Sequence, residues 1–275
     1  MVVLHLEVAS PQTDLIVAEL YEAGVLGITE TLAGEGITRL DAYLDNEAAA
    51  QELEARFAEW NPRISVADER DWVAHSRSQW KAIPVGDRFY LAPEWESAVE
   101  VPEGRILLPM PVGQGFGSGA HESTQLALSA LEHTQVEGSN VLDLGTGSGI
   151  LLAAAKAMGA ASLCGCDTDP VAIEAAQSYL QAQRLQASLF VGSIDAVKPR
   201  RFNLILANLN ATLILNLLDD LFGALRPHGR LILSGILREE GDVIHRVLNE
   251  TPGVTRVYHS ALGDWVNFRV TTSVH

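Results

Sequence analysis

Hydrophobic residues in the first part of the chain repeat with two different periods. Some stretches are short and apolar or alternate between apolar and polar residues, which predicts β-strands. Others carry apolar residues three or four positions apart, and one of them begins beside a capping residue and stops at glycine, which predicts helices. This βαββαβ order predicts a small ferredoxin-like α+β domain over residues 1–67. The expected elements are strands at 2–8, 25–32, 37–45 and 62–68 and helices at 13–24 and 47–60.

From residue 122 onward, strands and helices alternate regularly. Continuous apolar runs predict buried strands, and longer amphipathic stretches predict the helices between them. This alternation predicts an α/β fold with a doubly wound, Rossmann-like sheet in a domain over residues 105–275. The expected strands lie at 140–145, 162–167, 187–192, 202–209 and 230–237, the helices at 123–134, 149–160, 170–184, 211–225 and 239–250, and a final antiparallel pair at 255–262 and 265–272.

A stretch of different composition, residues 68–104, separates these two patterns. It is charged, and it holds Trp72, Trp80 and Trp95 among three prolines. We interpret it as a connector with a helical part and short strands, in which the tryptophans are packing anchors rather than ligand-stacking residues.

The formal net charge is −16, and it is distributed unevenly. Residues 1–69 hold 14 acidic and 3 basic residues, whereas residues 105–275 hold 15 acidic and 12 basic residues. Such an acidic N-terminal part repels the phosphate backbones of nucleic acids, so we expect no direct nucleic-acid binding. It would attract a basic partner, or it is a solvated surface that only aids solubility.

No apolar run approaches the length that spans a bilayer, and the N-terminus lacks a basic start followed by an apolar stretch. We therefore expect a cytoplasmic protein without a membrane partner. The two cysteines, Cys164 and Cys166, make a poor metal site by themselves, so we interpret them as small buried residues and expect no metal.

A glycine-rich sequence, DLGTGSG at 143–149, lies where a predicted strand meets a predicted helix. Glycines let the backbone turn sharply and approach a ligand closely, and the helix start offers unpaired N–H groups. Asp167 follows Gly145 by 22 residues at the end of the next strand, where an acid suits the ribose hydroxyls of an adenosine. The alternative is a plain tight turn. A dinucleotide-binding fingerprint is disfavoured because Ile150 stands where its third glycine would be.

The spacing of an acid and three glycines, D-x-G-x-G-x-G, resembles motif I of the S-adenosylmethionine-dependent methyltransferases. From the geometry of motif I, we expect Asp143, Gly147 and Gly149 to lie against the cofactor. Asn208 ends the fourth strand, where methyltransferases that act on amide nitrogens often hold the target nitrogen with a side-chain oxygen. The alternative for Asn208 is a helix cap or a turn residue.

Over essentially its whole length the chain resembles the ribosomal protein L11 methyltransferase (PrmA) family. The stretches that carry this resemblance are DERDWVAHSRSQWKAIPVGDRFYLAPEW, GFGSGAHEST, DLGTGSGIL, CDTDPVAI and ANLNATL. The resemblance implies methyl transfer from S-adenosylmethionine to lysine or N-terminal amines of a ribosomal protein, with an N-terminal domain that recognises the substrate. It implies that Thr124, Gly145, Asp167 and Asn208 contact the cofactor and that Asn208 orients the nucleophile. It also implies that the glycine run at 113–119 covers the methionine end of the cofactor.

The chain departs from the family pattern beside the place where the acceptor enters. Ser118, Ala120, Glu122 and Ser123 alter the first glycine run, and Leu-Asn-Ala-Thr follows Asn208. A related methyltransferase that acts on another protein or a small molecule therefore stays an alternative, as do an NAD-dependent oxidoreductase and a non-catalytic module that binds a basic partner. His121 matches a family position, and we expect it to shape the loop.

Overall fold

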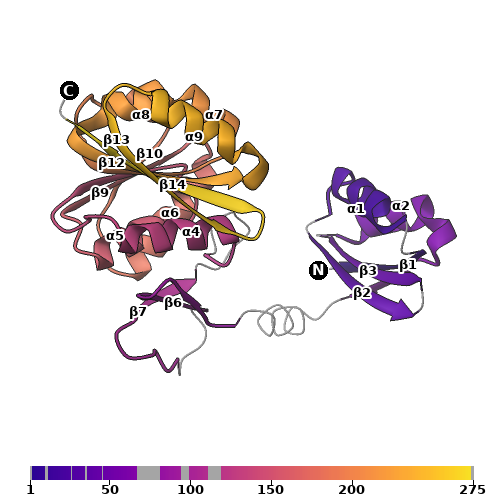
Figure 1. Ribbon diagram of the computed structural model, residues 1–275. Coiled ribbons are helices and arrows are strands. Elements are labelled where there is room, and N and C mark those ends of the chain that lie inside the picture. The colour runs from indigo at the N-terminus through magenta and orange to yellow at the C-terminus, as the bar shows by residue number, and fades with distance from the viewer. Residues whose placement is uncertain are drawn as a thin grey trace. The chain divides into compact units, whose positions relative to one another are not determined.

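The computed structural model forms two compact units, Met1–Trp80 and Lys81–His275 (Figure 1). It describes residues 2–9, 12–25, 27–34, 36–44, 46–66, 81–93, 99–110 and 119–273. The predicted connector, 68–104, spans the division between the units. Its three tryptophans and the glycines at 113, 115 and 117 lie outside the described residues.

The N-terminal unit is a four-stranded antiparallel sheet with two helices. The strands lie in the order β2-β3-β1-β4, so the first and third strands are central and antiparallel. The predicted βαββαβ order of elements is confirmed. The elements are β1 (Val2–Ala9), α1 (Thr13–Glu22), β2 (Gly27–Gly34), β3 (Ile37–Leu44), α2 (Glu47–Arg56), the 3-10 helix η2 (Ala58–Trp60) and β4 (Arg63–Val66).

One face of this sheet forms the core of the unit. Leu4, Leu6 and Leu40 are fully buried, and they alternate along their strands with polar residues. The polar residues lie on the other face, where His5 Nδ1 is 2.5 Å from Asp41 Oδ1 and His5 Nε2 is 2.7 Å from Ser65 Oγ. The alternation therefore fixes the register of three neighbouring strands, because a slip of one residue would exchange the two faces.

The C-terminal unit is built on a seven-stranded sheet with the order β10-β9-β8-β11-β12-β14-β13. All neighbouring strands are parallel except that β14 is antiparallel to both β12 and β13. Its strands are β8 (Asn140–Leu144), β9 (Ser162–Asp167), β10 (Ser188–Val191), β11 (Phe202–Asn208), β12 (Leu225–Leu237), β13 (Val254–Leu262) and β14 (Trp265–Thr272).

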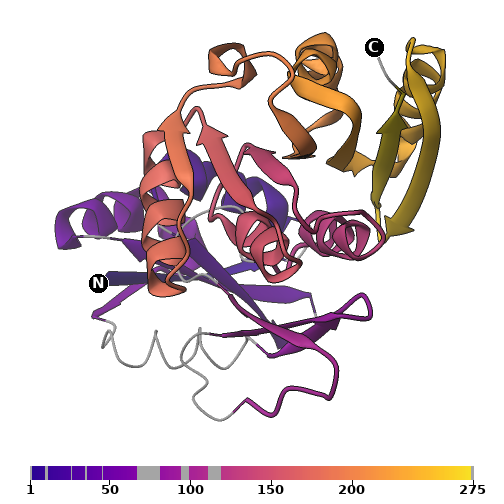
Figure 2. The ribbon, with the colours of Figure 1, turned by 90° about the vertical axis from the view of Figure 1, so that its left-hand side faces the viewer.

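Helices cover both faces of this sheet, as Figures 1 and 2 show. The apolar face of α7, α8 and α9 packs with strand residues into one buried cluster. On the other face lie α4, α5 and α6, so the predicted doubly wound α/β fold is confirmed. The helices are α4 (Glu122–Glu132), α5 (Ile150–Ala157), α6 (Pro170–Ala182), α7 (Ala211–Asn216), α8 (Leu218–Ala224) and α9 (Gly241–Glu250), with 3-10 helices η3 (Ile194–Ala196) and η4 (Arg238–Glu240).

Two sequence predictions in this unit were wrong in their boundaries. The helix expected at 211–225 is divided into α7 and α8 at Leu217, whose backbone has φ −101° and ψ 2°. The apolar spacing continues through this residue, so periodicity could not reveal the break. Strand β12 begins at Leu225 rather than at 230, and its pairing with β11 shifts register between Phe202 and Leu204.

A small third sheet belongs to the same unit. Its strands are β5 (Ile83–Val85), β6 (Phe89–Pro93) and β7 (Ile106–Met110), in the order β5-β6-β7. The turn between β5 and β6 is held to α4 because Glu132 accepts hydrogen bonds from the N–H groups of Asp87 at 2.8 Å and Arg88 at 2.9 Å. No helix among the described residues is long and apolar enough to cross a membrane.

Candidate active site

The predicted site residues gather at the carboxyl ends of β8, β9 and β11. Asp143 lies near the end of β8, Asp167 ends β9 and Asn208 ends β11. These strands are adjacent in the sheet, and strand order reverses between β8 and β11. Ligands of open α/β sheets bind at this edge and at this switch point.

The glycine motif forms the turn between β8 and α5. Gly145, Gly147 and Gly149 have φ of 70°, 51° and 83°, a region that other residues adopt only with strain. A Cβ atom on Gly145 would lie 2.6 Å from Leu209 Cδ2, and Gly149 is the cap of α5. The glycines are therefore required by backbone conformation, and they bring main-chain atoms to the sheet edge.

Asp143 is fully buried beneath this turn. Thr146 Oγ1 donates a hydrogen bond of 2.9 Å to its Oδ2, whereas its Oδ1 has no hydrogen-bond partner among the described residues. Burial raises the pKa of Asp143 from 3.8 to about 7; the bond from Thr146 lowers this pKa and the charge of Asp167 raises it further. A buried, unpartnered carboxylate oxygen fits a ligand that brings a positively charged or N–H donor.

Asp167 connects the end of β9 to the glycine turn. Its Oδ2 accepts a hydrogen bond of 3.0 Å from the N–H of Gly147, and its Oδ1 accepts one of 3.1 Å from the N–H of Asp169. Each carboxylate oxygen can accept a further hydrogen bond. The structure therefore brings Asp167 to the motif, as the 22-residue spacing predicted.

Asn208 and Thr124 meet across the site. Asn208 Nδ2 donates to Thr124 Oγ1 at 3.2 Å, and this orientation leaves the carbonyl oxygen of the amide as an acceptor. The cap of the next helix, α7, is Asn210, whose side chain accepts from the N–H of Leu213. The interpretation of Asn208 as a helix cap was therefore wrong.

His121 caps helix α4 rather than facing the other predicted site residues as a base. Its Nδ1 accepts from the N–H of Ser123 at 3.3 Å and lies 2.8 Å from Ser123 Oγ. Its ring meets the Trp265 ring edge-on, with centroids 4.8 Å apart. These contacts fix the start of the helix that carries Thr124.

Three residues at this edge escaped the sequence analysis: Ser234, Gly235 and Trp265. A glycine inside a strand pattern is a signal for a bulge or a close backbone approach, and it could have identified Gly235. Ser234 and Trp265 carry no such signal, because their importance depends on which strand and helix they contact.

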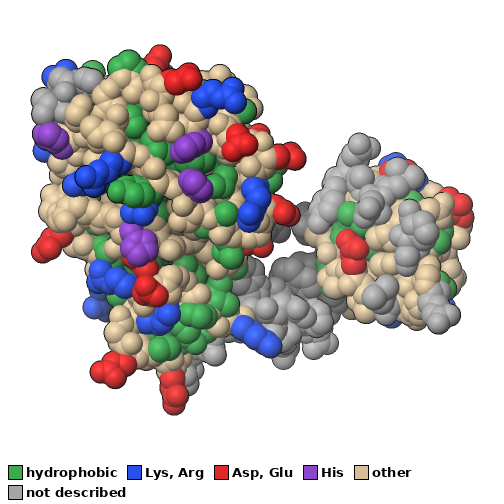
Figure 3. Space-filling view, in the orientation of Figure 1, with side chains coloured by type: hydrophobic (Ala, Val, Ile, Leu, Met, Phe, Trp, Pro, Cys, Tyr) green, Lys and Arg blue, Asp and Glu red, His purple; other side chains and the backbone are tan. Residues whose placement is uncertain are grey.

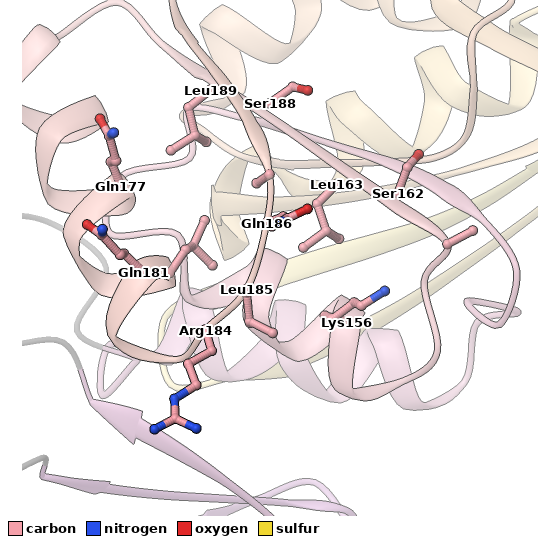
Figure 4. A pocket seen from close by; sticks show the side chains of 13 residues that line it. Lys156, Ser162, Leu163, Gln177, Gln181, Arg184, Leu185, Gln186, Ser188 and Leu189 are labelled. Atoms are coloured by element: carbon pink, nitrogen blue, oxygen red, sulfur yellow. The ribbon is translucent and has the colours of Figure 1, made fainter.

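Two cavities among the described residues lie at the opposite edge of the sheet. The larger one, about 930 Å³, is lined by Lys156 and Arg184, by amide and hydroxyl side chains, and by leucines of β9, β10 and α6 (Figure 4). The second, about 440 Å³, includes Cys164 and Arg201. Neither contains a predicted site residue. We therefore locate the site by its chemistry rather than by cavity size.

The cysteines are small residues of the sheet. Cys166 is buried, and burial raises the pKa of its thiol to about 12; the charges of Asp143, Cys164 and Asp167 act in the same direction. Cys164 is half-buried, and burial also raises its pKa. Among the described residues, no group of three or more His, Cys, Asp or Glu side chains could hold a metal ion.

Known proteins are similar to this chain over most of its length. A family model described as ribosomal protein L11 methyltransferase (PrmA) matches residues 9–273. A ribosomal protein L11 methyltransferase from Symbiobacterium thermophilum is 34% identical over 188 residues, which is 68% of this chain and 62% of that protein. One from Burkholderia vietnamiensis is 35% identical over 188 residues, covering 68% of this chain and 61% of that protein. The aligned part thus spans less than two thirds of these relatives.

A solved structure gives the same result for the fold. The ribosomal protein L11 methylase from Lactobacillus delbrueckii subsp. bulgaricus superposes with a TM-score of 0.64 and 29% sequence identity. The match covers 70% of this chain and 100% of that one. Since the family model spans nearly the whole sequence, the chain belongs to the ribosomal protein L11 methyltransferase (PrmA) family.

Proposed function

We propose that this protein transfers methyl groups from S-adenosylmethionine to lysine or N-terminal amino groups of ribosomal protein L11. Family membership supports this function. The observation that carries it is the convergence of the glycine turn, Asp167 and the Asn208–Thr124 pair on one edge of the sheet. The chain's departures around Glu122 and after Asn208 motivate the alternative, a related class I methyltransferase with another protein or a small molecule as acceptor.

The cofactor would be held by Thr124, Asp143, Gly145, Gly147, Gly149, Asp167 and Asn208. When bound, S-adenosylmethionine supplies an electrophilic methyl group on a positively charged sulfonium. Asp167 places a carboxylate at the site, and Asp143 Oδ1 has no hydrogen-bond partner among the described residues. Asp167 has lone pairs left for ribose hydroxyls beyond its two backbone partners. These residues therefore suit the cofactor's charge and its hydroxyl groups.

The protein's main task would be to hold a neutral amine in line. A lysine with a pKa of ~10.4 is neutral in only about one of 2,500 molecules at pH 7. Partial desolvation at the site lowers that cost, because it disfavours the charged form. The carbonyl oxygen of Asn208 is an acceptor for the amine N–H, so it would orient the lone pair. The Thr124 hydroxyl fixes the amide in this orientation.

The N-terminal unit would recognise the substrate. Its strand order and antiparallel pairing support a ferredoxin-like domain, and we propose the boundaries 1–67 for this domain, 68–104 for a connector and 105–275 for the methyltransferase domain. With 14 acidic and 3 basic residues in 1–69, it suits a basic ribosomal protein and disfavours direct nucleic-acid contact. On the face seen in Figure 3, the C-terminal unit carries positive and negative side chains side by side. We place this activity in the cytoplasm, without a membrane partner.

The sheet order speaks against an NAD-dependent oxidoreductase. Dinucleotide-binding sheets have the order 3-2-1-4-5-6, whereas here an antiparallel seventh strand, β14, lies between β12 and β13. Ile150 in place of the third fingerprint glycine points the same way. A non-catalytic binding module would not need the Asn208–Thr124 pair at the end of the fourth strand.

Incubation with methyl-labelled S-adenosylmethionine and separate purified acceptors tests the proposal. The acceptors are ribosomal protein L11, other ribosomal proteins of similar charge, and small amines. Label in L11 alone supports the proposal, and label in another acceptor alone supports the alternative. Cofactor binding without transfer to any acceptor would favour the binding module.

A further inference from the structure

Strand β12, near its end, contacts Asn208 and the first turn of α4, the helix that carries Thr124. Asn208 pairs with Ser234 across the parallel strands β11 and β12, and the N–H of Leu209 donates to the Ser234 carbonyl at 2.9 Å. We propose that Ser234 and Gly235 are positioning residues, which hold the start of helix α4 and the Asn208 amide in the arrangement that transfer requires. The catalytic consequence rests on the proposed function.

Ser234 ties β12 to the first turn of α4. Its side chain is fully buried, and its hydroxyl donates a hydrogen bond of 2.7 Å to the carbonyl oxygen of Ser123. Thr124, the next residue in the same turn, accepts the hydrogen bond from Asn208 Nδ2. A second bond holds the helix from the neighbouring strand, since Asn267 Nδ2 donates to the Leu126 carbonyl at 3.0 Å.

Gly235 leaves the space that the Asn208 amide occupies. Its φ is +80°, and a Cβ atom built on it would lie 2.9 Å from Asn208 Oδ1 and 2.7 Å from the Leu209 carbonyl oxygen. The second neighbour is backbone, so it cannot move aside as a flexible side chain would. Any side chain at 235 would therefore push on the Leu209 carbonyl and on the Asn208 amide.

A β-bulge at this point gives independent support. Between the pairs Leu233–Phe268 and Ile236–Val266, β12 contains one residue more than β14. The bulge therefore falls at Ser234 and Gly235, opposite Asn267. Bulges next to active sites commonly redirect side chains. Here the bulge turns the strand end so that one residue reaches α4 and the next leaves room for Asn208.

The variants Ser234→Ala and Gly235→Ala test this inference against two matched controls. Ser139→Ala also removes a buried hydroxyl that donates to a carbonyl, that of Gln135, but at the opposite edge of the sheet. Gly159→Ala also puts a Cβ on a left-handed glycine, φ +90°, with its nearest neighbour at 3.2 Å. Each pair thus shares the kind of change and differs in its distance from Asn208. The contact at Gly159 is with the Glu137 side chain, so it is looser than the backbone contact at Gly235.

The first readout is the side-chain amide signal of Asn208 in full-length protein labelled with ¹⁵N-asparagine, assigned by its loss in Asn208→Asp. We expect it to move in Ser234→Ala and Gly235→Ala and to stay unchanged in both controls. The second readout is methyl transfer: kcat should fall by about tenfold or more in the two test variants, with the Kd of S-adenosylhomocysteine within about threefold.

An unmoved Asn208 signal in both test variants, or kcat losses no larger than in the controls, would overturn the inference. A rise in the Kd of S-adenosylhomocysteine by the same factor as the fall in kcat would also overturn it, because the effect would then lie in cofactor binding. If the wild type methylates no acceptor, the proposed function fails. The Asn208 signal still decides whether the two residues position the amide.

Discussion

At the residue scale, the raised pKa of Asp143 predicts that the stability of the fold depends on pH. A pKa raised from 3.8 to about 7 means that the folded state holds a proton that the unfolded state has lost between these values. The free energy of unfolding should therefore fall as pH rises through this window, and stay level above it. The full difference corresponds to roughly 4 kcal/mol.

The Asp143→Asn variant, compared with wild type in denaturant titrations from pH 4 to pH 8, checks this expectation. The variant should gain stability relative to wild type as pH rises to about 7, because it has no carboxylate to ionise in a buried site. Asp195→Asn, at an exposed position, serves as the control for the removal of one carboxylate. A constant difference between the Asp143→Asn variant and wild type at all pH values contradicts the account.

Asp167→Ala should weaken binding of S-adenosylmethionine by about tenfold or more. Charge-assisted hydrogen bonds to the ribose are worth roughly 1.5–3 kcal/mol, and the variant also releases the N–H of Gly147. Calorimetry measures the effect, with Asp169→Ala as a neighbouring control. An unchanged Kd in a folded variant would remove Asp167 from the site.

Residues of the candidate site could be predicted from sequence only where one residue type is required at a strand end or in the turn that follows it. Asp143, the three glycines, Asp167 and Asn208 met this condition, and the structure brings them to one edge. Ser234 could not be predicted, because a serine in an apolar strand gives no sign that it contacts a helix more than a hundred residues earlier in the chain. Pairing between distant elements decides such positions.

At the element scale, the periodicity of hydrophobic residues predicted the type and order of nearly every described helix and strand. It failed where two elements share one pattern, as at Leu217 between α7 and α8. It also failed in β12, where exposed Arg-Pro-His residues follow Leu225 and hide the start of the strand. The order in which the strands lie in the sheet could not follow from period, because it depends on packing between elements.

The attachment of the small sheet β5-β6-β7 gives a prediction at this scale. Glu132 on α4 accepts two backbone hydrogen bonds from the β5–β6 turn. Glu132→Ala should lower the free energy of unfolding by about 1–3 kcal/mol, because two N–H groups lose a charged acceptor. Denaturant titration measures this loss, and Glu137→Ala on the exposed surface should cost less than half as much. Equal losses in both variants would mean that this attachment contributes nothing specific.

At the scale of the whole molecule, the net negative charge and the candidate site residues lie in different parts of the chain. The described site residues all belong to the C-terminal unit, whereas most of the net negative charge belongs to residues 1–69. Deleting residues 1–67 should therefore leave the Kd of S-adenosylhomocysteine nearly unchanged and sharply reduce methylation of a basic protein. Added salt should slow the intact enzyme on a protein acceptor, since exposed charges act through association rate. If the truncated chain methylates the protein as fast as the full chain, the acidic unit serves solubility alone.

The most direct measurement of the central claim is the intact mass of purified ribosomal protein L11 after incubation with this protein and S-adenosylmethionine. The account predicts mass increases of whole methyl groups with the wild type. It predicts almost none with Asn208→Ala, although that variant should still fold and bind S-adenosylhomocysteine. An L11 mass that never changes, or a fully active Asn208→Ala variant that has only lost stability, would contradict the account.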